Sequence, residues 1–413
     1  MKHASSHSQR VTLRHIRAAA RRIADSILFS PCPASPALSA LTGAELYCKM
    51  DNLQRTGSFK ERGARNSLLL LSPEQKKSGV IAASAGNHAL GLAYHGKLLG
   101  IPVTVVMPDY APLIKITSCE KLGAHVIVQG SDFAQARQHA DGLTHEKRLT
   151  YIHGFDDPNI IAGQGTLGLE ILQQVPDVEA IVIPVGGGGL IAGLAVAVKA
   201  LRPQVQIIGV ESEATASFTA ALKQGRPATV PRMPTLADGL AVLRVGDLAF
   251  ELARTRVDRV VTISEDWIAL AILRMLEVEK IVVEGASVAP LAAFLAGKLN
   301  DLAGKKTVLA VCGGNIDPMI LGRVIEKGMV ADGRLSQMTV VISDRPGGLA
   351  ALARVLAEAK ASIKDITHDR AFSGPDVSAS NALCTIETRD QFHLREVHHR
   401  LHADGFKILN APK

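Results

Sequence analysis

Short apolar runs alternate with helical stretches between about Lys49 and Val311, and this alternation limits the fold more than any other feature of the chain. The predicted strands are residues 79–84, 103–108, 125–129, 180–185, 207–210 and 308–311. The predicted helices between them include residues 89–99, 132–146, 160–174, 190–201 and 265–278. Apolar strands separated by helices are typical of parallel sheets that helices cover on both faces. The sequence therefore predicts an α/β fold with mostly parallel sheets.

A different order of elements begins near Gln337. Four further strands are predicted at residues 338–343, 362–370, 381–388 and 406–409, with helices at 349–359 and 390–403. The resulting order βαββαβ is typical of a ferredoxin-like domain. Residues 331–334 form the predicted linker, and residues 371–380 a mobile hairpin loop within the second domain.

Composition excludes several classes of protein. The chain of 413 residues carries a net charge of +7, but no long run of basic residues concentrates it, and aromatic residues make up only 4%. Nucleic-acid-binding proteins normally present a basic stripe with interleaved aromatics, so small acidic ligands fit this chain better than nucleic acid. The five cysteines are scattered and include no C-x-x-C pair, which argues against a disulfide framework or a zinc ribbon.

One uncharged segment, residues 180–198, is long enough to span a bilayer. Pro184 and four successive glycines interrupt it, so it is better explained as a strand, a loop and a helix. Residues 1–10 are polar and no apolar core follows them, which argues against a secretory signal. Residues 11–29 resemble an organelle presequence in composition, but an ordinary amphipathic first helix is the preferred interpretation. We therefore expect a cytoplasmic protein without a membrane segment.

The first functional motif is Thr56-Gly57-Ser58-Phe59-Lys60-Glu61-Arg62-Gly63. Ser58 and Glu61 fit an S-x-x-E capping box, which predicts a helix that begins at Phe59 and runs through the leucines of residues 68–71. Lys60 then stands in the first turn, where the helix dipole disfavours a cation and lowers the pKa of the amine. A neutral amine is available to form an imine, so Lys60 is a candidate catalytic residue. A surface lysine that tolerates this position is the alternative.

The second motif, Ser84-Ala85-Gly86-Asn87-His88, follows a predicted strand and precedes a predicted helix. Gly86 permits a ligand to approach the backbone closely, and the hydroxyl, amide and helix N–H groups suit a carboxylate. His88 is a candidate acid or base, although a histidine in the first turn of a helix is more often structural.

The third motif, Gly186-Gly187-Gly188-Gly189, again lies between a predicted strand and a predicted helix. Four glycines at a helix N-terminus indicate a phosphate-binding loop. Gly187, Gly189 and Ala192 also fit the pattern G-x-G-x-x-A, and Glu211 follows the next strand, where a ribose-binding acid is expected. This motif alone leaves a nicotinamide dinucleotide open, although such a fingerprint usually opens the first βαβ unit and this one lies in mid-chain.

The fourth motif, Cys312-Gly313-Gly314-Asn315, follows another predicted strand. A cysteine in such a position is most often a small buried hydrophobic residue. The alternative role of Cys312 is that of a weak hydrogen-bond partner for the ring nitrogen of a cofactor.

In this order and spacing, the motifs TGSFKERGA, SAGNHA, AGQGT, PVGGGG and CGGN resemble the fold-type II pyridoxal-phosphate enzymes, specifically the threonine dehydratase (threonine ammonia-lyase) and serine racemase group. The resemblance covers about residues 12–328, and the tail with its motif DRPGGL is similar to an ACT regulatory domain. It implies a two-lobed catalytic domain at residues 1–331 (large lobe about 1–50 and 155–331, small lobe about 51–154) and an ACT domain at residues 337–413.

The resemblance implies pyridoxal 5'-phosphate as the cofactor and gives the motifs their roles. Lys60 matches the catalytic Schiff-base lysine, which also exchanges the substrate α-proton. Phe59 matches the residue beside the pyridine ring, and Asn87 matches the partner of the cofactor's phenolic oxygen. Gly186-Gly187-Gly188-Gly189 matches the phosphate loop, in place of a dinucleotide site, and Cys312 matches the partner of the ring nitrogen.

Two further sets of residues follow from the same resemblance. Glu284, within Val283-Glu284-Gly285-Ala286, matches an acid near the cofactor ring. The loop of Ser84, Ala85, Gly86, Asn87 and His88 matches the loop that binds the substrate carboxylate in this group of enzymes.

The implied reaction is β-elimination from L-threonine to 2-oxobutanoate and ammonia, and from L-serine to pyruvate. A neutral partner at the ring nitrogen does not enforce ring protonation, which favours quick loss of the β-hydroxyl over slower side reactions. A serine or 3-hydroxyaspartate dehydratase or racemase is the alternative within the group. An NAD-binding dehydrogenase and a non-catalytic amino-acid sensor are the alternatives outside it. The resemblance also implies a role in isoleucine biosynthesis and a homodimer or homotetramer.

Two positions depart from the pattern of the group. Racemases place a second serine where this chain has Ala85, so we expect racemisation to be inefficient. Members with a divalent-cation site have an acid where this chain has Ser217, which leaves Glu211 with few partners. We therefore expect no divalent metal site, while a monovalent cation stays open.

In the tail, the turn Arg345-Pro346-Gly347-Gly348 leads into a predicted helix N-terminus. The free N–H groups of such a terminus suit the carboxylate of an effector amino acid. The resemblance implies allosteric regulation, with isoleucine or valine as the effector. A tail that only stabilises the oligomer is the alternative.

Overall fold

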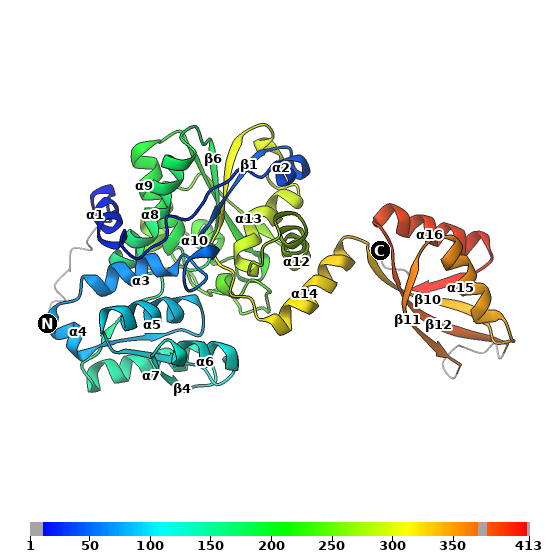
Figure 1. Ribbon diagram of the computed structural model, residues 1–413, viewed down its shortest axis with the longest axis horizontal. Coiled ribbons are helices and arrows are strands. Elements are labelled where there is room, and N and C mark those ends of the chain that lie inside the picture. Colours follow the sequence, from blue (N-terminus) through cyan, green and yellow to red (C-terminus); the bar gives the residue numbers. More distant parts are fainter. Residues whose placement is uncertain (1–10, 371–377, 411–413) are drawn as a thin grey trace. The chain divides into compact units, whose positions relative to one another are not determined.

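The computed structural model describes residues 11–370 and 378–410. The chain divides into two compact units, Met1–Pro318 and Met319–Lys413 (Figure 1). Most of the predicted loop at residues 371–380 lies outside the described residues. The four motifs that precede the tail all fall in the first unit, and the βαββαβ tail falls in the second.

The first unit is built on two parallel sheets. The larger has the strand order β1-β9-β6-β7-β8 and the smaller the order β4-β3-β2-β5, and each described pair of neighbours is parallel. The larger sheet contains β1 (Glu45–Met50), β6 (Ala180–Pro184), β7 (Gln206–Ser212), β8 (Arg259–Ile263) and β9 (Lys306–Val311). The smaller contains β2 (Val80–Ala83), β3 (Val103–Met107), β4 (His125–Val128) and β5 (Thr150–Tyr151). The predicted α/β fold with mostly parallel sheets is confirmed.

Each sheet has its own set of helices, which gives the first unit two lobes (Figure 1). One hydrophobic core joins β6, β7 and β9 to α8 and α9, and a separate one joins β2 and β3 to α5. The helices near the start are α1 (Leu13–Ile23), α2 (Pro36–Thr42), α3 (Lys60–Leu69), α4 (Pro73–Ser78), α5 (Asn87–Leu99), α6 (Leu113–Lys121) and α7 (Phe133–Glu146). Those that follow are α8 (Pro158–Gln174), α9 (Gly189–Leu201), α10 (Ser217–Gln224), α11 (Asp247–Ala253), α12 (Glu265–Arg274) and α13 (Gly285–Leu295).

Helix α8 packs closely against α3 and α9 because of the glycines in its AGQGT motif. A Cβ on Gly163 would lie 2.6 Å from the carbonyl oxygen of Arg62 on α3. A Cβ on Gly165 would lie 2.7 Å from the carbonyl oxygen of Gly193 on α9. Neither separation is compatible with a side chain unless the backbones move apart. The motif therefore holds α3, which begins at Lys60, tightly against α8.

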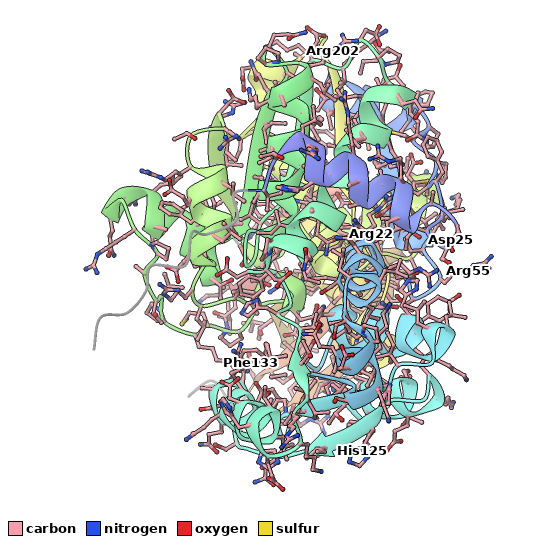
Figure 2. All side chains as sticks on the ribbon, turned by 90° about the vertical axis from the view of Figure 1, so that its left-hand side faces the viewer. Arg22, Asp25, Arg55, His125, Phe133 and Arg202 are labelled. Atoms are coloured by element: carbon pink, nitrogen blue, oxygen red, sulfur yellow. The ribbon has the colours of Figure 1, made fainter. Side chains whose placement is uncertain are left out.

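Helix α1 packs against α8 and also contacts α3 (Figure 2). Arg22 of α1 donates a hydrogen bond to Asn66 of α3. Asp25, which follows α1, forms an ion pair with Arg65 of α3 at 3.0 Å. The predicted amphipathic first helix within residues 11–29 is confirmed by α1.

The structure contains elements that the sequence pattern did not predict. They are the strands β1, β5 and β8 and the helices α2, α4, α6, α10, α11, α13 and α14 (Pro318–Ala331). Strands β1, β5 and β8 lie at the edges of their sheets, and β5 has only two residues, so their apolar pattern is short or weak. Helix α13 is buried over nearly its whole length, so it lacks the one-sided periodicity that identifies a helix.

The second unit has the predicted ferredoxin-like order. Its sheet has the strand order β11-β12-β10-β13, with each described pair antiparallel. After α14 (Pro318–Ala331), the elements are β10 (Leu335–Ser343), α15 (Gly348–Glu358), β11 (Ser362–Asp369), β12 (Ala379–Glu387), α16 (Gln391–Ala403) and β13 (Lys407–Asn410). Side chains from α15, α16 and the sheet form one hydrophobic core. The predicted βαββαβ domain is confirmed.

Among residues 11–370 and 378–410, no helix is both long and apolar enough to cross a membrane. The uncharged segment at residues 180–198 forms β6, the glycine loop and most of α9, as the sequence predicts.

Gly193→Ala tests the close approach of α8 and α9. A Cβ on Gly193 would lie 2.2 Å from the carbonyl oxygen of Ile161, so we expect the free energy of unfolding to fall. Overpacking of this kind costs about 1–3 kcal/mol. Gly142→Ala in α7 is the control, because its Cβ meets nothing within 4 Å. An exposed helical glycine replaced by alanine gains about 0.5–1 kcal/mol. Urea denaturation of both variants checks the two signs, and equal stabilities would contradict the packing described.

Candidate active site

Lys60 is the first residue of α3, and its amine lies inside the first unit. Its Nζ donates a hydrogen bond to the carbonyl oxygen of Gly154 at 2.7 Å and lies 5.2 Å from the centre of the Phe59 ring. Although the side chain keeps some exposed surface, removal of water from the amine lowers its pKa from 10.5 to about 8, while the charge of Glu284 opposes the shift. Lys60 is therefore not an ordinary surface lysine. Burial, rather than the helix dipole alone, accounts for the lowered pKa.

The segment before Lys60 is attached to the end of β9. Ser58 forms an isolated antiparallel β-bridge with Gly313. The amide of Phe59 donates a hydrogen bond to the carbonyl oxygen of Cys312 at 2.9 Å. The two residues that precede Lys60 are therefore bonded to the backbone of the Cys312 motif.

The predicted capping box at the start of α3 is wrong. The helix begins at Lys60, and Phe59 occupies the N-cap position instead of Ser58. The hydroxyl of Ser58 is buried without a hydrogen-bond partner among the described residues, and Glu61 bonds the amide of Thr56 instead. The physical reason is the β-bridge, which takes Ser58 out of the cap position.

The loop Ser84-Ala85-Gly86-Asn87-His88 connects β2 to α5, which begins at Asn87. Gly86 has open space around it, because a Cβ there would meet nothing within 4 Å. Ser84 and Ala85 are half-buried. The first N–H groups of a helix have no partner within the helix, so this loop offers both room and donors for a carboxylate.

His88 is buried. Its Nε2 lies 3.1 Å from the carbonyl oxygen of Ile152. Burial, together with the nearby charge of Lys60, lowers the pKa of His88 to about 3. A neutral ring must then donate its Nε2 proton to Ile152, which favours the structural interpretation of this histidine over a role as acid or base.

Asn87 belongs to a hydrogen-bonded group of amide and carboxyl side chains. Its Nδ2 donates to Oε1 of Glu284 at 2.8 Å, and its Oδ1 accepts from Nδ2 of Asn315 at 2.8 Å. Asn315 also donates to the carbonyl oxygen of Thr56 at 2.7 Å. Burial, and then the charge of Asp238, raise the pKa of Glu284 to about 7. The sequence analysis assigned no role to Asn315, although it stands in the CGGN motif.

Cys312 follows β9 and is almost fully buried. Its thiol donates a hydrogen bond to the carbonyl oxygen of Ala310 at 3.3 Å. Burial, and then the charge of Asp51, raise the pKa of the thiol well above its usual value. Cys312 is therefore a neutral thiol, which is compatible with both roles that the sequence left open.

The loop Gly186-Gly187-Gly188-Gly189 joins β6 to α9, with Gly188 in the left-handed N-cap conformation at φ 89°. A Cβ on Gly187 would lie 2.3 Å from the ring of Phe155, so glycine is needed there for packing as well as for any ligand. Phe155, to which the sequence analysis gave no role, follows Gly154, the acceptor of the Lys60 amine. The glycine loop and Lys60 therefore both contact the segment that contains Gly154 and Phe155.

These segments follow strands of both parallel sheets. The glycine loop and Cys312 lie at the carboxyl ends of β6 and β9 in the larger sheet, and the Ser84–His88 loop lies at the carboxyl end of β2 in the smaller sheet. Ligands of open α/β sheets bind at such carboxyl ends. Hydrogen bonds join the two sets, because Asn87 donates to Glu284, whose own amide donates to the carbonyl oxygen of Gly313. The predicted cofactor residues of the first unit therefore form one cluster.

Glu211 is hydrogen-bonded to the start of α10. Its carboxylate accepts hydrogen bonds from the amide of Phe218 at 2.7 Å, the amide of Thr219 at 2.8 Å and the hydroxyl of Thr219 at 2.6 Å. The carboxylate therefore caps this helix. In the described part of the chain, no group of three or more histidine, cysteine, aspartate or glutamate side chains is arranged to hold a metal ion.

The predicted effector residues lie in the second unit, at the turn between β10 and α15. Gly347 is the N-cap of α15, with φ 99°, and Gly348 begins the helix. The amide of Gly348 donates to the carbonyl oxygen of Arg345 at 3.1 Å. Arg345 and Pro346 are exposed.

Comparison with known proteins assigns the first unit to a family. The sequence profile of the family "Pyridoxal-phosphate dependent enzyme" matches residues 23–314. This span includes the Lys60 motif, the Ser84–His88 loop, the glycine loop and all of the Cys312 motif except Asn315.

The chain belongs to this family of pyridoxal-phosphate-dependent enzymes.

Individual relatives agree with this family. The chain is 45% identical over 398 residues to an L-threonine ammonia-lyase of Thermotoga maritima, which covers 96% of this chain and 99% of that protein. The solved structure of threonine deaminase isoform 2 from Solanum lycopersicum is 38% identical, with a TM-score of 0.74 over 77% of this chain and 87% of that one. Serine racemase from Dictyostelium discoideum is 35% identical, with a TM-score of 0.70 over 74% and 99%.

The residues of the cluster fit pyridoxal 5'-phosphate chemically. Lys60 has an amine that is partly neutral near pH 8. The glycine loop precedes an apolar helix whose first N–H groups suit a phosphate. Cys312 offers a neutral thiol. Family membership also decides against the nicotinamide dinucleotide that the glycine pattern alone had left open.

The pKa of Lys60 can be measured in the cofactor-free enzyme by pH-dependent acetylation and peptide mass spectrometry. We expect a midpoint of about 8 for Lys60. Glu284→Gln should lower this midpoint further, because the carboxylate is ionised above about pH 7 and its charge stabilises the ammonium form. A midpoint near 10.4, the value of an unperturbed lysine, contradicts the burial of this amine.

Proposed function

We propose that this enzyme eliminates the β-hydroxyl of L-threonine to give 2-oxobutanoate and ammonia, and converts L-serine to pyruvate in the same way. The observation that carries the proposal is the buried amine of Lys60, hydrogen-bonded to Gly154 and attached through Phe59 to the Cys312 motif. Relatives that cover nearly the whole chain bear the name L-threonine ammonia-lyase, which supports this substrate.

The cofactor, when bound, supplies an electron sink that stabilises negative charge at the α-carbon of the substrate. The chain's own residues would hold it in the following way. Lys60 provides the amine that anchors it, and the helix N-terminus behind Gly186-Gly187-Gly188-Gly189 receives its phosphate. Cys312 would serve as the neutral partner of the ring nitrogen, Phe59 would lie beside the ring, and Asn87 would be the partner of the phenolic oxygen.

The substrate carboxylate would be held by the loop of Ser84, Ala85, Gly86, Asn87 and His88. Its backbone amides and the hydroxyl of Ser84 act as donors, while His88 fixes the loop to Ile152. Lys60 would remove the α-proton, because an amine with a pKa of about 8 is substantially neutral in a mildly alkaline solution. Glu284, with a pKa of about 7, is the acid near the ring.

Lys60→Ala tests the assignment of the catalytic residue. Removal of the amine should reduce keto-acid formation from threonine by at least about a thousandfold, because the anchor of the cofactor and the base are lost together. Circular dichroism should show an unchanged fold. Lys49→Ala is unsuitable as a control because its amine is buried, so Lys97→Ala in α5 serves instead. Normal 2-oxobutanoate production by Lys60→Ala would falsify the proposal.

The racemase alternative is disfavoured by one position. Ala85 lacks the hydroxyl that the racemases of the resemblance carry, so no side chain at this point of the loop exchanges a proton. A keto-acid assay with threonine, serine and 3-hydroxyaspartate compares the rates of elimination from the three candidate substrates.

Ala85→Ser should raise racemisation of L-serine relative to elimination, because it restores a proton-exchanging hydroxyl. The check is a chiral assay of D-serine alongside pyruvate, with the unaltered enzyme as reference. If the unaltered enzyme forms D-serine as fast as pyruvate, the interpretation of Ala85 is wrong.

The tail is proposed to be an ACT domain that regulates the enzyme. We assign catalysis to residues 1–331, with a large lobe at about 1–50 and 155–331 and a small lobe at about 51–154, and regulation to residues 337–413. The turn Arg345-Pro346-Gly347-Gly348 leads into α15, so the helix N-terminus suits an effector carboxylate. A homodimer or homotetramer, a cytoplasmic location and a role in isoleucine biosynthesis complete the proposal.

Binding of isoleucine or valine to the full-length enzyme tests this regulation by calorimetry. Arg345→Ala should weaken binding, whereas Arg354→Ala, which removes an exposed ion pair within α15, should not. Binding couplings are reciprocal, so an effector that weakens threonine binding must itself bind less well to the substrate-loaded enzyme. Absence of binding, with kinetics that isoleucine leaves unchanged, contradicts the regulatory role.

A further inference from the structure

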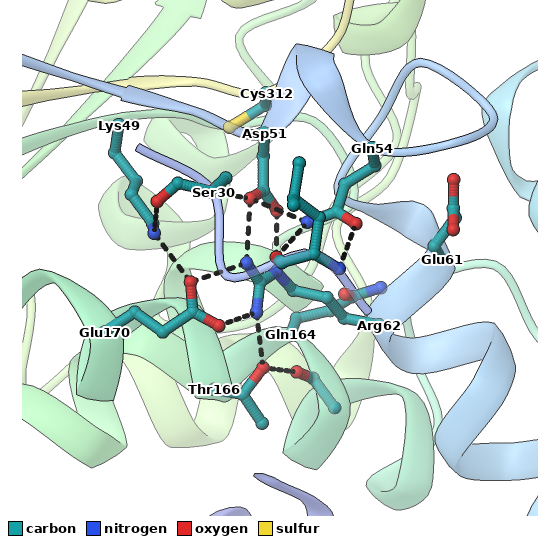
Figure 3. Close-up of polar contacts among 12 residues, drawn as sticks. Ser30, Lys49, Asp51, Gln54, Glu61, Arg62, Gln164, Thr166, Glu170 and Cys312 are labelled. Carbon is teal, nitrogen blue, oxygen red and sulfur yellow. Dashed lines mark hydrogen bonds and ion pairs between the residues drawn. The ribbon is translucent and has the colours of Figure 1, made fainter. Parts of the chain in front are cut away.

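Four charged side chains lie buried together behind the start of α3, and the proposed reaction gives them no role. They are two cations and two anions, so the group is neutral overall: Lys49, Asp51, Arg62 and Glu170 (Figure 3). Lys49, Asp51 and Arg62 have no exposed side-chain surface, and Glu170 keeps 15%. We call these four residues the ion cluster.

Arg62 is the centre of the ion cluster. Its Nε and Nη2 donate to the two carboxylate oxygens of Asp51 at 2.6 and 2.8 Å. Its Nη1 and Nη2 donate to the two oxygens of Glu170 at 2.5 and 2.9 Å, and Nη1 also donates to the hydroxyl of Thr166 at 3.1 Å. The guanidinium thus binds two carboxylates in a planar, bidentate manner that a lysine ammonium cannot reproduce.

Asp51 connects the ion cluster to the Cys312 side of the active site. It follows Met50, the last residue of β1, which pairs in parallel register with Val311 of β9. Asp51 and Cys312 therefore directly follow two strands that pair with each other, and the charge of Asp51 acts on the Cys312 thiol (Figure 3).

The lysine is consequently held from two sides. Before it, Phe59 bonds the backbone of Cys312. After it, Arg62 bonds Asp51, beside the same cysteine, and Glu170 of α8. Only one residue separates Lys60 from Arg62, so the position of the amine relative to the thiol depends on both attachments.

Stability alone is a weak reason for such a cluster. Burial of ions costs free energy, and well-packed hydrophobic residues often hold a fold as well or better. A buried ion group with bidentate geometry, in contrast, fixes the positions of the backbones that carry it. The ion cluster is therefore suited to fixing the distances between the backbone segments that carry its four side chains.

We propose that Arg62 is a positioning residue, which acts through Asp51 and Glu170 to hold the amine of Lys60 at a fixed place relative to Cys312. The proposal rests on the proposed function in that Lys60 is taken as the anchor of the cofactor. The ion cluster lies behind α3, and Arg62 acts on the reacting groups only through the helix that it shares with Lys60.

Arg62→Lys tests the proposal because it keeps the charge and loses the bidentate geometry. The measurements are kcat and KM for threonine, the position of the visible absorption band of the bound cofactor, and the acetylation midpoint of Lys60 in the cofactor-free enzyme. We expect kcat to fall about 10- to 100-fold while KM changes less than about threefold, since small displacements of reacting groups are costly. The absorption band should shift. The midpoint of Lys60 should rise from about 8, because a displaced amine regains water.

Arg65→Lys is the matched control on the same helix. Arg65 is also buried, but its partner Asp25 is largely exposed. The Arg65→Lys variant should leave kcat, the absorption band and the acetylation midpoint of Lys60 unchanged. Thr166→Val is a milder variant for the case that Arg62→Lys does not fold, since it removes one neutral hydrogen-bond partner of Arg62. It should change the same three quantities in the same direction, with a smaller loss of kcat.

A merely structural role gives a different result. If the folded variants melt at a lower temperature but keep the kcat, the absorption band and the Lys60 midpoint of the unaltered enzyme, the positioning role is overturned. The midpoint is measured without cofactor or substrate. It therefore decides the positioning of Lys60 even if the unaltered enzyme proves inactive on threonine, an outcome that would instead count against the proposed function.

Discussion

The two carboxylates on the guanidinium of Arg62 are the interaction on which the rest of the first unit depends. They join the end of β1, the start of α3 and the middle of α8 in a region from which water is excluded. A broken pair would leave a buried charge uncompensated, which typically costs about 3–5 kcal/mol, so the arrangement tolerates little change. The glycines of α8 permit the close backbone contact that brings these elements within reach of each other.

Burial also sets the protonation of the candidate active site. Water is kept from the amine of Lys60, the carboxyl of Glu284, the imidazole of His88 and the thiol of Cys312. In each case the removal of water favours the neutral form. Near neutral pH, the site thus presents neutral or partly neutral groups to an anionic cofactor and an amino acid. This environment suits proton exchange at a carbon atom better than the binding of a metal ion.

Much of this could be predicted from the sequence because local patterns determine it. The alternation of apolar strands and helices predicts the parallel sheets, and the glycine loop and Cys312 follow strands as expected. The spacing of the motifs also agrees with the family profile that matches residues 23–314. Motifs that follow neighbouring strands of one parallel sheet meet at its carboxyl end, so the glycine loop after β6 and Cys312 after β9 could be grouped from the sequence.

The errors and omissions arise where distant segments meet. The capping box at Ser58 fails because a β-bridge to Gly313, more than 250 residues away in the sequence, removes the serine from the helix end. Asn315 and Phe155 gained no role because their partners come from other parts of the chain.

Glu211 and Arg62 show the same limitation. The carboxylate of Glu211 caps a helix that sequence periodicity did not predict. The sequence gives the identity of Arg62 but not its partners: Asp51, which directly follows β1, and Glu170 of α8. Tertiary contacts of this kind have no periodic signal in the chain.

The central claim is that the fold selects one amine, that of Lys60, for the cofactor. Lys49 and Lys115 are also buried lysines, so burial alone does not distinguish the three. Borohydride reduction of the enzyme with bound pyridoxal 5'-phosphate, followed by peptide mapping, identifies the lysine that carries the cofactor. The account predicts a single pyridoxyl group on the peptide that contains Lys60. A pyridoxyl group on Lys49 or Lys115, with Lys60 unmodified, would contradict it.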